Sequence, residues 1–151
     1  MVQRCSLHGF LMFFLLFMGC TQEEPRYYSR ETRTKSYSDV MAELELAITE
    51  RNYRITGHNK IGSVIRERDQ IDFPDYDTFQ FCNLTLAREM LELSPESVSW
   101  MPCNMALRVE NEKVILTTHL LKEDPRNPKL AAFAKKINAQ LKEIVDFAVE
   151  N

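Results

Sequence analysis

The sequence predicts an α+β fold, a two-layer sandwich in which helices pack on one face of a mostly antiparallel sheet of about five strands. Two periodicities predict it. Polar and apolar residues alternate over several short segments, as in strands with one buried face, and apolar residues recur every three to four positions over longer segments, as in amphipathic helices. The third observation is the order of the segments: a strand, a helix and a strand, then further strands and a long last helix.

The first strand and the first helix are expected before residue 53. Residues 26–35 mix β-branched and aromatic side chains in rough alternation, which indicates a strand. Ser36 or Ser38 can cap the helix that follows, and Asp39 complements the positive end of its dipole. Asn52 suits the left-handed conformation that ends a helix. One apolar face repeats at helical spacing: Val40, Leu44 and Ala47, with Met41 and Ile48 beside them.

The middle of the chain predicts two more strands with a short helix between them. Residues 53–58 indicate a second strand, and the two glycines Gly57 and Gly62 are expected to bracket a turn. A short helix is expected over residues 63–69. Residues 78–81 predict a third strand that leads directly into a cysteine.

Asn83 is expected to cap a helix over residues 84–93, which ends at Ser94 and Pro95. Its expected apolar face is Leu84, Ala87 and Leu91.

The last third of the chain predicts a hairpin and the longest helix. Residues 101–109 and 113–120 indicate the fourth and fifth strands, joined by a tight turn at Asn111 and Glu112. In the fourth strand one side is apolar: Met105, Leu107 and Val109. A helix is expected from Asn127 or Pro128 to Val149, with a continuous apolar stripe: Leu130, Phe133, Ile137, Leu141, Ile144 and Ala148.

The N-terminus has the composition of an export signal. Arg4 supplies a positive charge, and residues 10–18 form an unbroken apolar run. Such a run is too short for a transmembrane helix, which needs roughly 20 residues, but fits the core of about 7–15 residues in a signal peptide. We therefore divide the chain into a lipoprotein signal peptide at residues 1–19, a tether at 20–25 and a single α+β domain at 26–151.

Gly19 directly before Cys20 resembles the lipobox of bacterial lipoproteins, in which the cysteine thiol takes a lipid and becomes the mature N-terminus. Phe17 and Met18 depart from the pattern, which prefers a leucine and a small residue there. The alternative is ordinary secretion with an unpaired Cys20, a liability outside the cytosol. Lipidation predicts a protein anchored to a membrane of the cell envelope and facing the periplasm, and Thr21 favours the outer membrane over the inner one.

The charge balance argues against a nucleic-acid partner. The formal net charge is −3, and removal of residues 1–19 takes away Arg4 only, which leaves 18 basic and 22 acidic side chains. Nucleic-acid binders usually carry a basic excess or stripe, whereas the basic cluster here, at residues 26–35, is interrupted by Glu31. With 44% hydrophobic and 27% charged residues, the composition is that of an ordinary folded domain.

Cys82 and Cys103 are the cysteines that stay in the domain if Cys5 leaves with the signal and Cys20 takes the lipid. Three outcomes remain open for them: a structural disulfide that stabilises by roughly 3 kcal/mol, a dithiol that binds a soft metal or cycles in redox reactions, or two buried inert thiols. Cys82 directly precedes a helix start, where the positive end of the helix dipole lowers a thiol pKa.

The neighbours of the two cysteines are candidate supporting residues. An asparagine follows each cysteine: Asn83 and Asn104. Trp100, Met101 and Met105 lie beside Cys103 and are expected either to line an apolar pocket or to belong to the core.

Histidines and aspartates provide weaker candidates. His58 and His119 could complete a four-ligand metal set with the cysteines, but the separations match no recognised zinc spacing. Asp72, Asp75 and Asp77 lack the spacing of a calcium loop, so we expect a solvated acidic loop there. The sequence therefore predicts no bound metal or other cofactor.

The segment around the cysteines resembles the domain of unknown function 302 family over about residues 27–149. The motifs that carry the resemblance are Phe81-Cys82-Asn83, Leu86-Ala87 and Leu91, then Met101-Pro102-Cys103 before a hydrophobic strand, with Phe73-Pro74-x-Tyr76 leading in. Leu84 departs from the family, which often has proline after Cys-Asn. The resemblance implies a compact α+β domain with a mostly antiparallel sheet that can form a homodimer, and it implies no activity.

The expected function is a non-catalytic, membrane-tethered periplasmic binding or interaction domain whose ligand the sequence does not identify. It follows from the lipobox, the small domain, and the lack of a recognisable catalytic motif in the sequence. The alternative is a thiol-redox or soft-metal-handling protein that uses Cys82 and Cys103.

Overall fold

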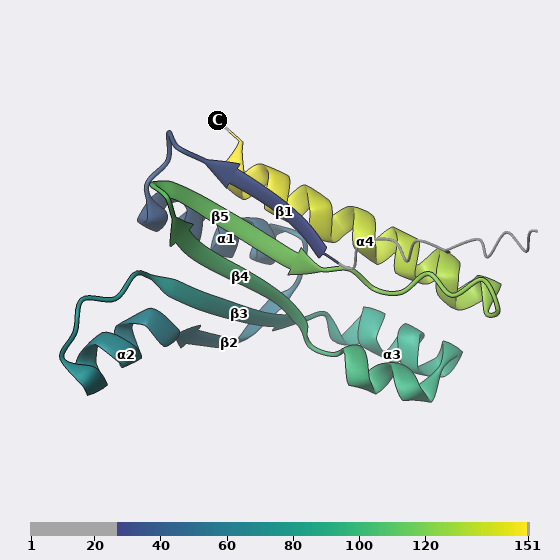
Figure 1. The fold of residues 1–151 in the computed structure, drawn as a ribbon. Coiled ribbons are helices and arrows are strands. Elements are labelled where there is room, and N and C mark those ends of the chain that lie inside the picture. Colours follow the sequence, from purple (N-terminus) through teal and green to yellow (C-terminus); the bar gives the residue numbers. More distant parts are fainter. Residues whose placement is uncertain (1–26, 151) are drawn as a thin grey trace, which may run out of the picture.

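The computed structural model describes residues 27–150, which form five strands, four α-helices and one 3₁₀ helix (Figure 1). The proposed signal peptide, the tether and Cys20 lie outside these residues. In chain order the elements are β1 (Tyr27–Thr32), α1 (Tyr37–Glu50), β2 (Arg54–Lys60), α2 (Ile61–Asp69), β3 (Tyr76–Cys82), α3 (Leu84–Leu93), η1 (Pro95–Trp100), β4 (Cys103–Glu110), β5 (Lys113–His119) and α4 (Pro128–Val149).

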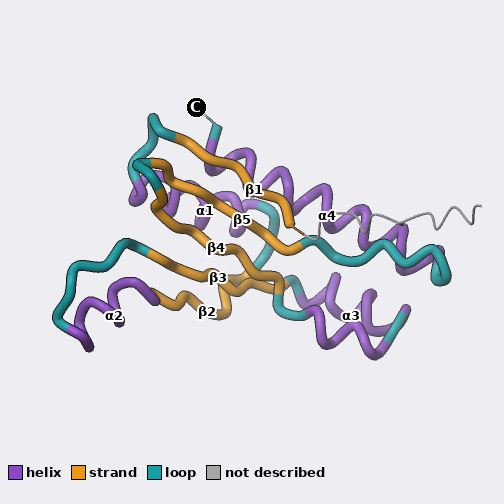
Figure 2. The backbone as a smooth tube through the Cα atoms, in the orientation of Figure 1, coloured by secondary structure: helices purple, strands orange, loops and turns teal. Residues whose placement is uncertain are grey.

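The strands form one sheet in the order β1-β5-β4-β3-β2, and every neighbouring pair is antiparallel. Figures 1 and 2 show α1 and α4 on the same face of this sheet, α2 at one end and α3 at the other. The α+β prediction is thus confirmed. Because β1 and β2 form the two opposite edges of the sheet, α1 must cross it to connect them.

The hydrophobic core lies between the sheet and the two helices that cover it. The apolar faces predicted for α1 and α4 are buried, and so are the alternating apolar residues of the strands. The largest side chains that are fully buried there are Phe79, Phe81, Leu44, Ile48, Met105, Leu107, Leu116, Leu141 and Ile144.

The helix caps and the hairpin turn that the sequence predicted are present. Ser36 and Asp39 form a reciprocal capping box at the start of α1. Asn52 has a φ of 60°, in the left-handed region that ends helices. Asn111 and Glu112 have φ values of 52° and 61°, as a two-residue hairpin turn between β4 and β5 requires.

The predicted glycine turn is wrong, because both glycines lie inside regular elements. Gly57 lies in β2, next to an irregularity in its pairing with β3, and an added Cβ atom would lie 2.8 Å from Gln80 Oε1. Gly62 lies in the first turn of α2, where a Cβ atom would clash with the backbone oxygen of Pro74. Glycine is therefore needed at Gly62 for close packing rather than for chain reversal, whereas at Gly57 the nearest atom is the end of a flexible side chain that can move.

Most strand boundaries differ from the prediction by one to three residues, and two of these differences have a local cause. β1 ends at Thr32, and the following residues bend towards the start of α1. β4 begins at Cys103, because η1 and a cis Met101–Pro102 peptide bond occupy the segment before it. Proline has no N–H to donate to the ladder, so pairing starts after it.

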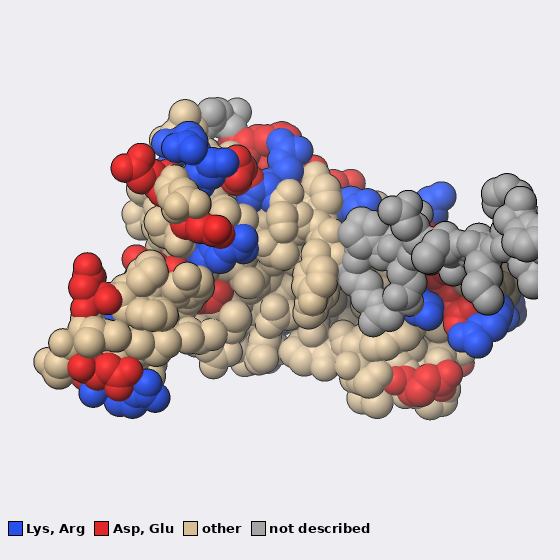
Figure 3. Space-filling model, in the orientation of Figure 1, with Lys and Arg blue, Asp and Glu red and all other residues tan. Residues whose placement is uncertain are grey.

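The second face of the sheet is not covered by α1 or α4. Figure 3 views the molecule from this side and shows uncharged side chains over the middle of the sheet, with Lys, Arg, Asp and Glu nearer its margins. Of the helices within residues 27–150, none is long and apolar enough to span a bilayer.

Candidate functional site

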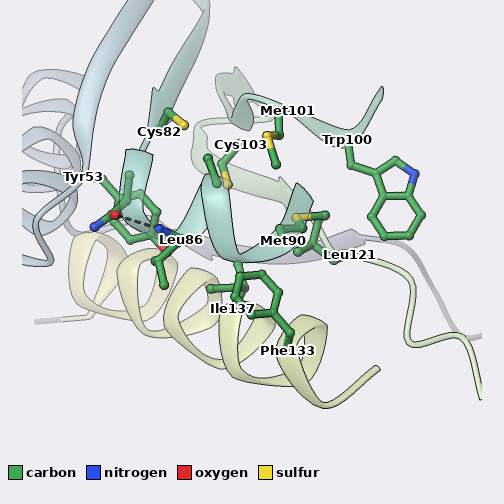
Figure 4. A pocket seen from close by; sticks show the side chains of 12 residues that line it. Tyr53, Cys82, Leu86, Met90, Trp100, Met101, Cys103, Leu121, Phe133 and Ile137 are labelled. Carbon is green, nitrogen blue, oxygen red and sulfur yellow. Dashed lines mark hydrogen bonds between the residues drawn. The ribbon is translucent and has the colours of Figure 1, made fainter. Parts of the chain in front are cut away.

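A small apolar cavity lies at the end of the sheet where β3 stops and β4 begins (Figure 4). Its volume is about 30 Å³, room for one or two water-sized particles. It is lined by Tyr53, Cys82, Asn83, Leu86, Ala87, Met90, Trp100, Met101, Cys103, Leu121, Phe133 and Ile137. The cavity thus brings together both cysteines of the described chain and two of the predicted supporting residues, Asn83 and Trp100.

Asn83 fixes the helix that forms one wall of the cavity. Its Oδ1 accepts hydrogen bonds from the backbone N–H groups of Thr85 and Leu86, at 3.0 and 3.1 Å. Its Nδ2 donates to the backbone oxygen of Asn52 at 2.9 Å. The predicted cap is confirmed, and its second bond ties α3 to the turn that follows α1.

The two cysteines are free thiols, and their places in the sheet explain why they are not bridged. Cys103 is paired with Phe81, and both side chains point to the helix-covered side of the sheet. Cys82 follows Phe81 directly, so its side chain points toward the opposite face. Two cysteines whose Cβ atoms point apart cannot form a disulfide unless the backbone moves.

Burial, rather than the helix dipole, dominates the acidity of both thiols. Burial raises the pKa of Cys82 above its ordinary value, which overturns the prediction that the N-terminus of α3 lowers it. Burial and then the neighbouring Cys82 raise the pKa of Cys103 to about 11. Because an apolar site disfavours the thiolate, both thiols carry their protons at neutral pH.

Tyr53 lies between the cavity and α4. Its hydroxyl donates a hydrogen bond of 2.7 Å to Gln140 Oε1, and its ring packs edge-on against Phe81. Burial, followed by the charges that Cys103 and Cys82 would carry as thiolates, raises the pKa of the Tyr53 phenol. Tyr53 therefore contributes a neutral, already bonded hydroxyl.

The apolar face predicted for α3 is wrong at Leu84, whereas Ala87 of the same predicted face lines the cavity. Leu84 is 82% exposed, whereas Met90 is 4% exposed and faces the cavity, with Leu86 packed against the core nearby. Positions 84, 87 and 91 and positions 86, 90 and 93 share the same helical spacing, so periodicity alone does not decide between the two faces. Met90 is the cavity residue missed for this reason.

The remaining candidate residues near Cys103 do not all lie at the cavity. Met101 lines the cavity with Trp100, whereas Met105 is fully buried in the core and does not line it. Asn104 does not line the cavity either; it pairs with Gln80 across the ladder, and its backbone oxygen accepts a hydrogen bond from Thr118 Oγ1.

A second group of polar side chains lies at the other end of β3. Asp77 is only 7% exposed, and its Oδ2 lies 2.7 Å from His58 Nε2, while the His58 ring stacks on Phe79. Burial, then the charges of Asp77 and Asp75, raise the pKa of the Tyr37 phenol beside them. The prediction of a solvated acidic loop is therefore wrong for Asp77, whose alternation in β3 turns it toward the core.

The two histidines do not join the cysteines. His58 belongs to the group at the far end of β3, and the ring of His119 lies 4.4 Å from that of Tyr27. In the part of the chain that the structure covers, no three residues of the His, Cys, Asp and Glu types lie close enough to hold a metal ion together.

Comparisons with known proteins agree with this architecture. A family model described as "Domain of unknown function DUF302" matches residues 28–148. The chain is also similar to a solved structure, an uncharacterized conserved DUF302 protein from Bacillus stearothermophilus. The two share 16% sequence identity with a TM-score of 0.72, over 82% of this chain and 98% of the other, so the likeness shows the fold alone. Among the curated proteins searched, nothing matches.

Proposed function

Since the chain belongs to the DUF302 family, a family defined by a domain without an assigned function, we propose that it is a non-catalytic binding domain of the cell envelope. In this proposal a lipid on Cys20 tethers the protein to a membrane, preferably the outer one, with the domain facing the periplasm. The cavity between α3, β4 and α4 receives a small ligand.

The observation that carries the binding proposal is the cavity itself. Apolar side chains from α3, α4 and the segment before β4 line it, together with the two cysteines, which carry free thiols. Well-packed cores leave few voids larger than a water molecule, so a cavity that gathers both thiols is a candidate binding site.

The same geometry disfavours thiol-redox chemistry, the alternative that the sequence left open. The thiolate is the attacking species in thiol chemistry, and burial raises the pKa of both thiols. A disulfide between Cys82 and Cys103 would also require the end of β3 to turn, because their side chains leave the ladder on opposite faces. Binding of a ligand requires no disulfide between them.

Access to the cavity can be tested with xenon, a probe of apolar cavities, on protein labelled with ¹³C at the methionine methyl groups. We expect xenon to shift the methyl signals of Met90 and Met101 and to leave that of Met41, on α1, in place. The variant Ala87→Val should reduce the shifts by filling the cavity from α3. Equal shifts at Met41 and Met90, or none at either, would overturn the binding proposal.

The tether can be tested by mass spectrometry of the protein purified from cell membranes. We expect a chain that begins at Cys20 and carries acyl groups, and we expect Cys20→Ser to lose both the acyl mass and the membrane association. An intact leader without acyl groups would contradict the lipid tether. It would not affect the proposal that the cavity binds a ligand.

A further inference from the structure

Sulfur is concentrated around the cavity. Residues 27–150 contain two cysteines and four methionines, and four of these six sulfur-bearing residues line it: Cys82, Met90, Met101 and Cys103. They come from four successive segments, the end of β3, helix α3, the residue after η1 and the start of β4. In the view of Figure 4, Cys103 lies between Cys82 and Met90, with Met101 next to it.

From this arrangement we infer that the cavity binds one soft, singly charged metal cation of the copper(I) class, held by the Cys103 thiolate and the thioethers of Met90 and Met101, with Cys82 at the rim. The inference rests on the proposed binding function and names its ligand. Thiolate and thioether sulfurs are the donors that select copper(I) over harder ions.

The donor set excludes hard cations. None of the described residues that line the cavity carries a carboxylate or another charged group. Its two polar side chains already have partners, since Tyr53 donates to Gln140 and Asn83 caps α3. Calcium and magnesium require six or more oxygen ligands or a shell of water, and the cavity offers neither.

Charge balance favours a singly charged ion over a doubly charged one. Burying net charge in an apolar site is costly, so the bound state should be close to neutral. A cation of charge +1 with the single thiolate of Cys103 and two thioethers has no net charge. A zinc ion would need the thiolates of both Cys82 and Cys103 for neutrality, but the Cys82 side chain leaves the ladder on the opposite face.

The size of the cavity agrees with an ion rather than an organic ligand. A cavity of about 30 Å³ is at least tenfold smaller than the roughly 300–1,000 Å³ of ordinary small-molecule pockets. An ion with metal–sulfur distances of about 2.3 Å joins sulfurs roughly 4 Å apart, whereas a disulfide requires about 2.05 Å. Sulfurs that are not placed for a covalent bridge can therefore still share an ion.

Binding involves a proton transfer and no change of oxidation state. The Cys103 S–H bond breaks, its proton goes to water, and the sulfur electron pair forms the bond to the metal. Because an ordinary cysteine thiol has a pKa of about 8.5, Cys103 carries its proton at neutral pH until the metal displaces it. One proton should thus be released per ion bound at neutral pH.

The test is a titration of the full chain, purified in detergent, with silver(I) as a non-redox probe and with copper(I) against a chromogenic chelator. We expect one ion and one released proton per cavity. Cys103→Ser should weaken binding by about 100-fold or more and abolish the proton release, and Met90→Leu with Met101→Leu by about 10-fold or more. Met105→Leu, a buried methionine on β4 that does not line the cavity, should change the affinity less than twofold.

Methionine-to-leucine exchange nearly conserves volume, so these variants should fold, which circular dichroism checks. If Cys103→Ser does not fold, Cys103→Ala replaces it in the titration. Equal affinity in wild-type and Cys103 variants, or equal loss in the cavity and Met105 variants, would overturn the inference. Xenon shifts at Met90 and Met101 without metal binding would overturn the metal inference alone, and the absence of both would overturn the binding function as well.

Discussion

The two ends of β3 both carry titratable side chains on or beside the core, but the surroundings of these side chains differ. At the start of the strand, Asp77 is buried and its carboxyl oxygen lies 2.7 Å from His58, with Tyr37 beside the pair. At the end, Cys82 and the neighbouring Cys103 are free thiols at the wall of a cavity.

This difference indicates which end is available to a ligand. A buried polar group that is hydrogen-bonded to a partner stabilises the fold, and its donor is no longer available to a ligand. A thiol is a weak donor and can be buried without a partner at little cost, so its bonding capacity remains free. We therefore propose that the Asp77 end contributes to stability and the Cys103 end to binding.

The largest expected effect comes from removing the carboxyl group of Asp77, which tests whether this end of β3 contributes to stability. We expect Asp77→Ala to lower the free energy of unfolding by about 2–4 kcal/mol, because it leaves the His58 ring, whose side chain is 21% exposed, without its carboxylate partner. Asp75→Ala is the matched control, since Asp75 is half-exposed and pairs with Arg66; it should cost less than about 1 kcal/mol. Urea unfolding measures both, and a cost for Asp77→Ala no larger than that of the control would remove the structural role.

The second prediction concerns pH at the Cys103 end. The folded-state pKa of about 11 lies above the unfolded value near 9, so the folded protein keeps a proton that the unfolded chain loses. The resulting stability is fully present below pH 9 and is lost as the pH rises toward 11, by about 2–3 kcal/mol in total.

Comparison with Cys103→Ala isolates this effect, because the buried tyrosines, which also titrate above pH 10, are common to both proteins. We expect the stability difference between wild type and variant to shrink between pH 8 and 10.5 in chemical unfolding. A difference that stays constant with pH would show that Cys103 is not buried as a neutral thiol.

The smallest expected effect tests how the helix beside Cys82 is held. We expect Leu84→Pro to raise the free energy of unfolding by about 0.4–1 kcal/mol, because Leu84 is the first residue of α3 and Asn83 before it is extended, with φ −113° and ψ 113°. Thr85→Pro is the control and should destabilise the protein, since it removes the backbone N–H that donates a hydrogen bond to Asn83 Oδ1. Thermal unfolding distinguishes the two, and a loss of stability with Leu84→Pro would contradict this account of the helix start.

The sequence predicted most of the fold because local rules decide it. The capping box of Ser36, the left-handed Asn52 and the stripe of α4 each depend on a few neighbouring residues, and all three are confirmed. The glycines were misassigned because the close approach of Gly62 to the backbone at Pro74 is a tertiary contact. The sequence alone does not show which distant segment a glycine faces.

The candidate site was predicted in part for the same reason. Cys82, Cys103, Asn83 and Trp100 were identified from one continuous motif, and they line one cavity. Met90 and the α4 residues that complete it depend on how helices pack on the sheet. The burial that raises the thiol pKa values likewise arises only when those helices are in place.

The place where β1 starts has a consequence for orientation. Tyr27, its first residue, pairs with His119 at the end of β5, which is the end of the sheet where β4 begins at Cys103. A lipid attached a few residues upstream would therefore pull this end toward the bilayer surface and direct α2 away from it. A ligand that arrives from the membrane side would then reach the sulfur-lined end of the protein first, without any rotation of the domain.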